Sequence, residues 1–141
     1  MSINNPNLTR RKIMNAHLVL LHTRDHDFEK LLTEALGKSG ATILVARNVA
    51  DTLEIGCTRG AELDFAVIDR DDCHAITLLS AINACYHELP IVVVTSSESC
   101  HCTAVAYANG AAACLAKPIT ATEIELVLSK LGQPKLQLTA A

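Results

Sequence analysis

The segment LDFAVIDRDD, residues Leu63 to Asp72, contains an unbroken apolar run, Phe65 to Ile68, that ends in carboxylates. An apolar run without polar alternation is typical of a strand that is buried on both faces of a parallel sheet. In open α/β sheets, ligands and chemistry gather at the carboxyl ends of the strands, where the strand order reverses. We therefore expect Asp69, at the end of this strand, to lie at the functional edge of the molecule.

The composition indicates one domain with a real core, because half of the 141 residues are apolar. The net charge of -3 gives no basic surface of the kind that nucleic-acid binders show, so we expect no nucleic-acid partner. No apolar run approaches the roughly 18 residues that a membrane span needs. We therefore expect a cytoplasmic protein, whose six cysteines are free and mostly packed thiols.

The chain divides into three parts. Residues 1–16 are polar, contain the basic run Arg10 to Lys12, and are predicted to form a mobile N-terminal arm. Residues 17–132 carry the alternating apolar patterns of a folded domain, and residues 133–141 are predicted to be a C-terminal tail. We find no repeat and no second domain.

Within the domain, short apolar runs alternate with segments of helical periodicity. The predicted strands are His17 to Leu21, Thr42 to Ala46, Phe65 to Ile68 followed by Asp69, Ile91 to Thr95, and Ala112 to Ala116. The predicted helices are Asp25 to Leu36, Val49 to Thr58, a segment marked by Ile76, Leu78, Leu79, Ile82 and Tyr86, about Ser99 to Ala108, and Ala121 to Leu131. Thr120 with Glu123 forms a capping box before the last helix. Five strands alternating with five helices predict an α/β fold with a doubly wound parallel sheet.

This arrangement brings polar residues from distant parts of the chain to one edge of the sheet. The predicted strand ends carry His22, Thr23, Asp69, Asp71, Asp72, Thr95, Ser96 and Lys117. Because the carboxyl ends of parallel strands meet at one edge, we expect these residues to line a single small polar cleft.

With these motifs, the chain from about Ala16 to Leu131 resembles the receiver domain of bacterial response regulators, a flavodoxin-like (βα)5 fold typified by CheY. The resemblance implies the strand order 2-1-3-4-5. It also implies that Asp69 is the phosphoacceptor and Thr95 the hydroxyl residue at the end of the fourth strand. Lys117 matches the family's lysine, which precedes a proline, usually through a cis bond.

The chain departs from the family pattern where the first strand ends. The family normally has two adjacent acids there that help to hold Mg²⁺, and this chain has His22 and Thr23. Magnesium prefers oxygen ligands, usually carboxylates with water and phosphate. We therefore expect no conventional magnesium site, no other cofactor, and slow phosphoryl transfer onto Asp69. Asp71 and Asp72 are the candidates for a substitute carboxylate.

Two further departures concern signal readout and the role of His22. The loop after Asp69 is about two residues shorter than in the family, and Cys114 replaces the aromatic residue usual on the fifth strand. We interpret His22 as a solvated loop histidine. A second hypothesis is that His22 protonates near neutral pH and supplies positive charge beside Asp69.

The cysteines and histidines offer an alternative function. Cys100, His101 and Cys102 are clustered, and Cys73 precedes His74, so a metal-binding or redox-sensing module on the same fold is the rival hypothesis. The simpler interpretation is that these thiols are small packed hydrophobes. A flavin-carrying enzyme is set aside, because the sequence HTRDHDF after the first strand lacks the Ser, Thr and Gly residues of a phosphate loop.

We interpret the chain as a stand-alone atypical receiver domain, not an enzyme, that acts through protein contacts. The resemblance implies a histidine kinase or a downstream effector as partner. It also implies possible homodimerisation through the fourth helix, fifth strand and fifth helix, around Ala104, Tyr107, Ala108 and Glu123. Either phosphorylation of Asp69 shifts a conformational equilibrium, or the domain is a constitutive docking module that has lost this chemistry. The sequence slightly favours the second hypothesis.

Overall fold

A computed structural model describes residues 17–71, 74–96 and 100–131, and these form a five-stranded parallel sheet flanked by helices. The strands are β1 (Leu18–His22), β2 (Thr42–Ala46), β3 (Phe65–Asp69), β4 (Ile91–Thr95) and β5 (Ala113–Ala116). Their order in the sheet is β2-β1-β3-β4-β5, which confirms the predicted flavodoxin-like topology. The predicted arm, residues 1–16, and tail, residues 133–141, lie outside the described residues.

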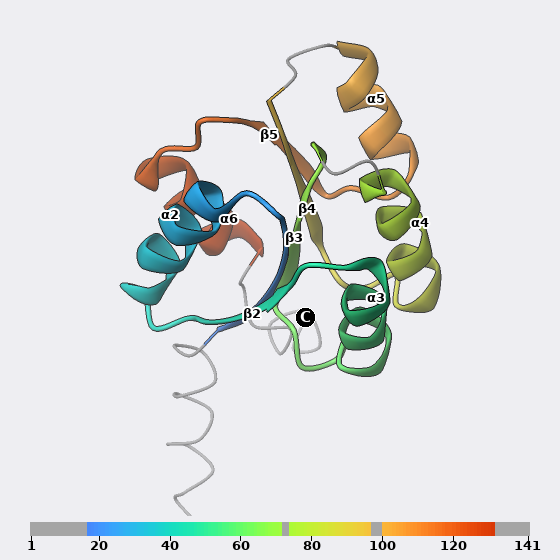
Figure 1. Ribbon diagram of the computed structural model, residues 1–141, viewed down its shortest axis with the longest axis horizontal. Coiled ribbons are helices and arrows are strands. Elements are labelled where there is room, and N and C mark those ends of the chain that lie inside the picture. The colour runs from blue at the N-terminus through green and yellow to red at the C-terminus, as the bar shows by residue number, and fades with distance from the viewer. Residues whose placement is uncertain (1–16, 72–73, 97–99, 132–141) are drawn as a thin grey trace, which may run out of the picture.

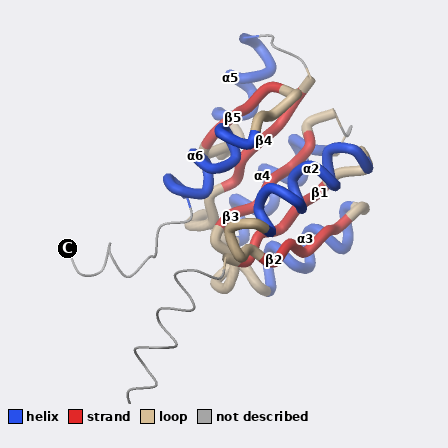
Figure 2. Tube along the Cα trace, turned by 90° about the vertical axis from the view of Figure 1, so that its left-hand side faces the viewer, coloured by secondary structure: helices blue, strands red, loops and turns tan. Residues whose placement is uncertain are grey.

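The helices cover both faces of the sheet, as Figure 1 shows. They are α2 (His26–Gly37), α3 (Val49–Thr58), α4 (Ala75–Cys85), α5 (Cys100–Ala108) and α6 (Ala121–Leu131). Helices α2 and α6 pack on one face, whereas α3, α4 and α5 pack on the other (Figure 2). The sheet is therefore the central layer of a three-layer molecule.

The strand sequences are almost wholly apolar because both faces of each central strand are buried. All five residues of β3 and all five of β4 are buried. Along β3, Phe65 and Val67 belong to the core cluster under α2 and α6, while Ala66 and Ile68 belong to the cluster on the opposite face. Successive strand residues point to opposite faces, so a strand between two helical layers has no position for a polar residue until it ends.

The first strand extends one residue further than the sequence predicted. His22 is the last residue of β1, where it pairs in register with Ala46 of β2 and Ile68 of β3. Its side chain is fully buried, with 0% exposure. The interpretation of His22 as a solvated loop histidine is therefore wrong, because the parallel pairing on both sides keeps this residue inside the sheet.

Short polar side chains fix the beginnings of three helices. Asp25 caps α2 by accepting hydrogen bonds from the backbone N–H groups of Asp27 and Phe28 at 3.0 and 3.1 Å. Asn48 caps α3 through the N–H of Asp51 at 2.8 Å. Before α6, Glu123 N–H donates to Thr120 Oγ1 at 3.1 Å and Thr120 N–H donates to Glu123 Oε1 at 3.0 Å, which confirms the predicted capping box.

Gly110 provides a test of the turn between α5 and β5. Its φ is +109°, and an added Cβ would lie only 2.6 Å from Asn83 Cγ. We predict that Gly110→Ala lowers the free energy of unfolding by about 2 kcal/mol, because an L side chain is strained at this φ and collides with Asn83. Urea unfolding measures the change.

Gly37→Ala is the matched control. An added Cβ at Gly37 meets nothing within 4 Å and its φ is not positive, so Gly37→Ala should leave the free energy of unfolding unchanged or raise it by up to about 1 kcal/mol. Equal losses in the two variants would contradict the role assigned to Gly110.

Candidate functional site

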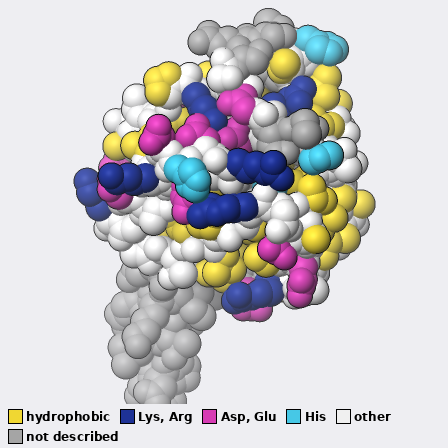
Figure 3. All heavy atoms as spheres, in the orientation of Figure 1, with side chains coloured by type: hydrophobic (Ala, Val, Ile, Leu, Met, Phe, Trp, Pro, Cys, Tyr) yellow, Lys and Arg dark blue, Asp and Glu magenta, His cyan; other side chains and the backbone are white. Residues whose placement is uncertain are grey.

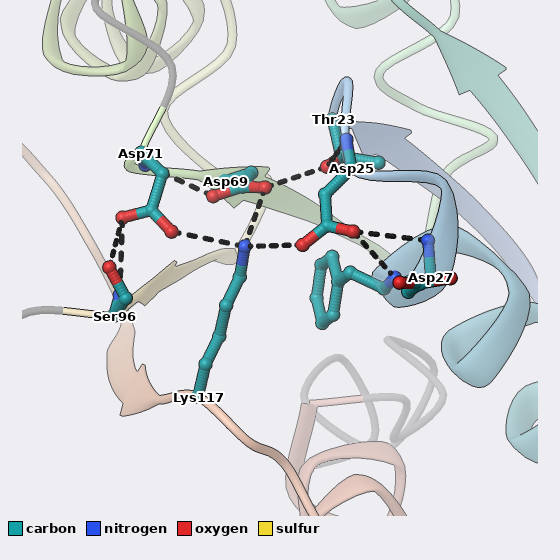
Figure 4. Close-up of polar contacts among 8 residues, drawn as sticks. Thr23, Asp25, Asp27, Asp69, Asp71, Ser96 and Lys117 are labelled. Carbon is teal, nitrogen blue, oxygen red and sulfur yellow. Dashed lines mark hydrogen bonds and ion pairs between the residues drawn. The ribbon is translucent and has the colours of Figure 1, made fainter.

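The candidate site lies at the carboxyl edge of the sheet, around Asp69. Asp69 is the last residue of β3 and is 3% exposed. Lys117 follows β5, and its Nζ donates to Asp69 Oδ2 at 2.9 Å, as Figure 4 shows. The structure thus brings together the two residues that the sequence placed at the ends of the third and fifth strands.

Local contacts hold Lys117 in this direction. Its backbone N–H donates to the carbonyl oxygen of Thr95 at 2.8 Å, which ties the end of β5 to the end of β4. The Lys117-Pro118 bond is cis, as the family resemblance implied. The ammonium group lies 5.0 Å from the centre of the Phe28 ring, at the start of α2, a distance within the usual range of cation–π contacts.

Three carboxylates converge on the ammonium group of Lys117 (Figure 4). Its Nζ lies 3.2 Å from Asp25 Oδ2, 2.9 Å from Asp69 Oδ2 and 3.1 Å from Asp71 Oδ2. Figure 3, which has the orientation of Figure 1, shows acidic side chains gathered beside basic ones on this face of the molecule. The cluster of Asp25, Asp69, Asp71 and Lys117 is called the carboxylate cluster below.

Asp25 was predicted only as the first residue of a helix, and its place in the site was missed. Asp25 Oδ1 accepts the capping hydrogen bonds of α2, while its Oδ2 reaches Lys117. The signal that could have identified Asp25 is its distance from β1. A helix cap three residues beyond a strand must lie at the carboxyl edge of that strand, beside the other strand ends.

Thr23 bonds directly to the candidate phosphoacceptor. Its Oγ1 donates to Asp69 Oδ2 at 2.7 Å and accepts from the N–H of Asp25 at 3.0 Å. The other carboxylate oxygen, Asp69 Oδ1, accepts from the N–H of Asp71 at 3.0 Å. Both oxygens of Asp69 are therefore engaged by protein donors, and Oδ2 accepts from both Thr23 and Lys117.

Asp71 faces the cleft, as its candidacy for a substitute carboxylate requires. Its Oδ1 accepts from both the N–H and the Oγ of Ser96, at 3.1 and 3.0 Å, and its Oδ2 faces Lys117. The second candidate, Asp72, lies outside the described residues. Thr95 is buried at the end of β4, and its role as a hydroxyl reporter stays a prediction.

The opposite charges of the carboxylate cluster stabilise the ionised forms of its members. Partial burial opposes the charged form of Lys117, but hydrogen bonds to Asp69 and Asp71 outweigh it and raise the pKa of Lys117. The pKa of Asp25 is lowered, chiefly by the N–H of Phe28 and also by Lys117. Burial opposes the ionisation of Asp71, yet the N–H of Ser96 and Lys117 together lower the pKa of Asp71. The ionised forms of these three groups are thus favoured at neutral pH.

His22 faces away from the cluster. In β1, His22 shares the face of Leu20, which packs with α3 and α4, whereas Asp69 shares the face of Val67 under α2 and α6. The His22 Nδ1 lies 2.8 Å from the Oγ1 of Thr52, which donates its proton to the carbonyl oxygen of Asn48 at 2.7 Å. The hydroxyl has one proton, so Nδ1 must be the donor to Thr52. The hypothesis that His22 supplies positive charge beside Asp69 is therefore wrong.

The arrangement of oxygens does not fit a conventional Mg²⁺ site. Magnesium needs near-octahedral oxygen coordination around one position, and here the three carboxylates surround the ammonium group of Lys117. Across residues 17–71, 74–96 and 100–131, no three His, Cys, Asp or Glu side chains are arranged to hold a metal ion. The absence of a magnesium cofactor stays a prediction.

The thiol cluster proposed as a rival site receives no support. Cys73 lies outside the described residues, as does the side chain of Cys100. Of the described cysteines, Cys102 is partly buried and Cys114 packs against the core from β5. No helix in the described part of the chain combines the length and apolarity needed to cross a bilayer.

A parallel sheet in the order 2-1-3-4-5, with an aspartate ending β3 and a lysine following β5, defines the class of CheY-like signalling modules. The family model for the response regulator receiver domain matches residues 19–129. The chain belongs to this family.

Solved structures agree with the family. A response regulator receiver domain protein from Clostridium thermocellum is 18% identical with a TM-score of 0.77, and the match covers 86% of this chain and 98% of that one. A CheY-like receiver domain protein from Methanospirillum hungatei is 18% identical with a TM-score of 0.74, covering 89% and 99%. NtrX from Brucella abortus is 21% identical with a TM-score of 0.77, covering 89% of this chain but 28% of its own length. No curated protein matches the chain.

The carboxylate cluster predicts the effect of Lys117→Met. Removing the ammonium group leaves three carboxylates facing one another, so we expect the free energy of unfolding to fall by about 3 kcal/mol at pH 7. The lowered pKa values of Asp25 and Asp71 give stability that is present above about pH 4 and is lost as the pH falls through the folded-state values. The raised pKa of Lys117 gives stability that is lost as the pH rises through its folded-state value, above about 10.4.

Urea unfolding from pH 3 to pH 7 separates this effect from general damage. The difference between the wild type and Lys117→Met should shrink at the acidic end, where the carboxylates are protonated. Lys130→Met is the control, because Lys130 is exposed in the last turn of α6 and should change stability by less than about 0.5 kcal/mol. A pH-independent loss in Lys117→Met would show that the cluster is not the cause.

Proposed function

We propose that this receiver domain is atypical, that Asp69 is phosphorylated slowly or not at all, and that the domain signals through protein contacts. The observation that carries the proposal is the engagement of Lys117 by Asp25, Asp69 and Asp71. In addition, the two residues at the end of the first strand, His22 and Thr23, contribute no carboxylate. The cleft is thus organised around an ammonium group of the protein itself.

The chemistry of phosphoryl transfer supports this proposal. The transferred group carries charge on its oxygens, and catalysis depends on positive charge placed to neutralise it, supplied mainly by metal ions. Without a conventional metal site, Lys117 is the cation nearest to Asp69 in the cluster, and its charge is shared among three carboxylates. Asp69 would have to attack the phosphoryl group through a carboxylate oxygen. Its Oδ2 already accepts hydrogen bonds from Thr23 and Lys117.

The second hypothesis is that Asp69 is phosphorylated despite these departures and shifts an equilibrium between two conformations. The pairing of Asp69 with Lys117 favours it, because both of the family's marks are present and in contact. Phosphorylation would then act as a local charge change that biases a two-state element. The two hypotheses differ in whether Asp69 reacts.

Phosphorylation of Asp69 can be measured directly. We predict that the protein, incubated with Mg²⁺ and a small phosphodonor, gains no Asp69-dependent phosphoryl mass over the time in which a conventional receiver is fully labelled. Beryllofluoride should likewise produce no spectral change that Asp69→Asn abolishes. The physical reason is the missing carboxylate at the end of β1.

Thr23→Asp is the matched gain-of-function variant. It places a carboxylate where Thr23 now donates to Asp69 at 2.7 Å, so Mg²⁺ should raise its melting temperature while leaving that of the wild type unchanged. Labelling of Asp69 should become at least about tenfold faster. If the wild type is labelled as fast as Thr23→Asp, the chemistry is intact and the second hypothesis holds.

For a domain that acts by contact, the proposed surface is the one formed by α5, β5 and α6. Within it, Ala104, Tyr107 and Ala108 are exposed, and Tyr107 is 50% exposed despite its size. Aromatic side chains are enriched at interfaces because they bury a large area at low entropic cost. Glu123 is engaged in the capping box, so we assign it a smaller part. We propose a histidine kinase, an effector or a second copy of the chain as the partner, with no nucleic acid.

The homodimer can be tested by sedimentation at increasing protein concentration. We predict that Tyr107→Glu weakens self-association at least about tenfold, because it puts a charge in the centre of the contact. Leu31→Glu is the control, since Leu31 is 39% exposed on α2, outside this surface. An equal effect of both variants, or none from Tyr107→Glu, would place any dimer contact elsewhere.

A further inference from the structure

Helices α3 and α4 pack against each other along one seam. A Cβ added to Gly56 would lie 3.1 Å from Ile82, and one added to Gly60 would lie 2.9 Å from the ring of Tyr86. The two contacts are four residues apart on each side, and the second lies just beyond the ends of α3 and α4. The absence of side chains at Gly56 and Gly60 therefore leaves room for Ile82 and Tyr86. Figure 1 shows α3 and α4 side by side along this length.

Two cysteines border this seam. Cys57 follows Gly56 on α3, and Cys85 ends α4 directly before Tyr86, so each thiol lies beside one of the close contacts between the two helices. Both are free thiols, with Cys85 exposed and Cys57 partly buried. Burial, together with the contact to Cys85, raises the pKa of Cys57 to about 11. At neutral pH, Cys57 is thus held as a neutral thiol beside a more accessible one.

We propose that Cys57 and Cys85 are a modification site: they form a reversible disulfide that ties α3 to α4 when the protein meets a small-molecule disulfide such as oxidised glutathione. The proposal does not depend on the chemistry at Asp69. It uses a thiol pair that lies on the other side of the sheet from α2 and α6, away from the cleft.

The reaction balances as two successive exchanges. The Cys85 thiolate attacks one sulfur of oxidised glutathione, which forms a mixed disulfide and expels one glutathione thiolate. Cys57 then loses its proton to solvent and attacks Cys85 Sγ, which forms the Cys57–Cys85 bond and expels the second glutathione. Two protein thiols are oxidised, and one disulfide is reduced to two thiols. Cys85 reacts first, because only thiolates attack and the raised pKa of Cys57 keeps it protonated.

The packing of the seam favours the intramolecular product. Disulfides need Cα atoms close together with side chains directed at each other, and the contacts at Gly56 and Gly60 hold the two helices at short range on both sides of Cys57. A bond between residues 57 and 85 also closes a loop in the unfolded chain, so the oxidised form should be the more stable one.

The test uses the full-length chain in which the other four cysteines are replaced by serine. After incubation with oxidised glutathione, intact mass spectrometry should show a species lighter than the reduced protein by two hydrogens. Its melting temperature should be higher, and a reductant should reverse both changes. Changing Cys57→Ser in this chain should leave only the glutathione adduct on Cys85.

A second measurement keeps the test decisive if the serine-substituted chain does not fold. In the wild type, cleavage after glutamates separates Cys57 from Cys85 at Glu62 but leaves Cys73 and Cys85 on one fragment, so Cys85→Ser is needed to identify the pair. Linked fragments that disappear in both Cys57→Ser and Cys85→Ser support the proposal. Glutathione adducts on Cys85 without linked fragments, in protein that circular dichroism shows to be folded, would overturn it.

Discussion

The contact between Lys117 and its three carboxylates is the constraint around which the functional edge is arranged. It joins the start of α2, the end of β3 and the segment after β5, which are far apart in the sequence. Like charges a few ångströms apart repel by a few kcal/mol even at an effective dielectric constant of about 20. One cation placed among the three carboxylates turns this repulsion into attraction, so the loops at this edge depend on a single side chain.

Much of the fold can be predicted from the sequence, because central strands that are buried on both faces must be apolar. The runs FAVI and IVVVT must lie between two helical layers, and β4 and α6 have the bounds that the sequence predicted. The capping box of Thr120 and Glu123 is equally local, since both partners lie within one helical turn. Features decided by neighbours in the chain were therefore predictable.

Features that depend on which face of the sheet a side chain points to were harder to predict. The position of His22 at a strand end suggested the cleft, yet the alternation along β1 puts it on the face of Leu20, where it meets Thr52 of α3. That alternation is readable from the sequence once β1 is extended by one residue. Asp25 was missed for a different reason. Its local role as a helix cap concealed a second contact, to a lysine 92 positions away.

The replacement of two acids at the end of β1 has an electrostatic consequence that reaches beyond metal binding. His22 makes a hydrogen bond inside the core and Thr23 makes one to Asp69, so both positions are satisfied without charge. A carboxylate at position 23 would add to the three already facing Lys117, and a cluster with that much negative charge requires a further cation to be stable. With the neutral pair, the ammonium group of Lys117 has fewer charges to offset. The neutral residue at position 23 is therefore compatible with a cluster that a single ammonium group holds together.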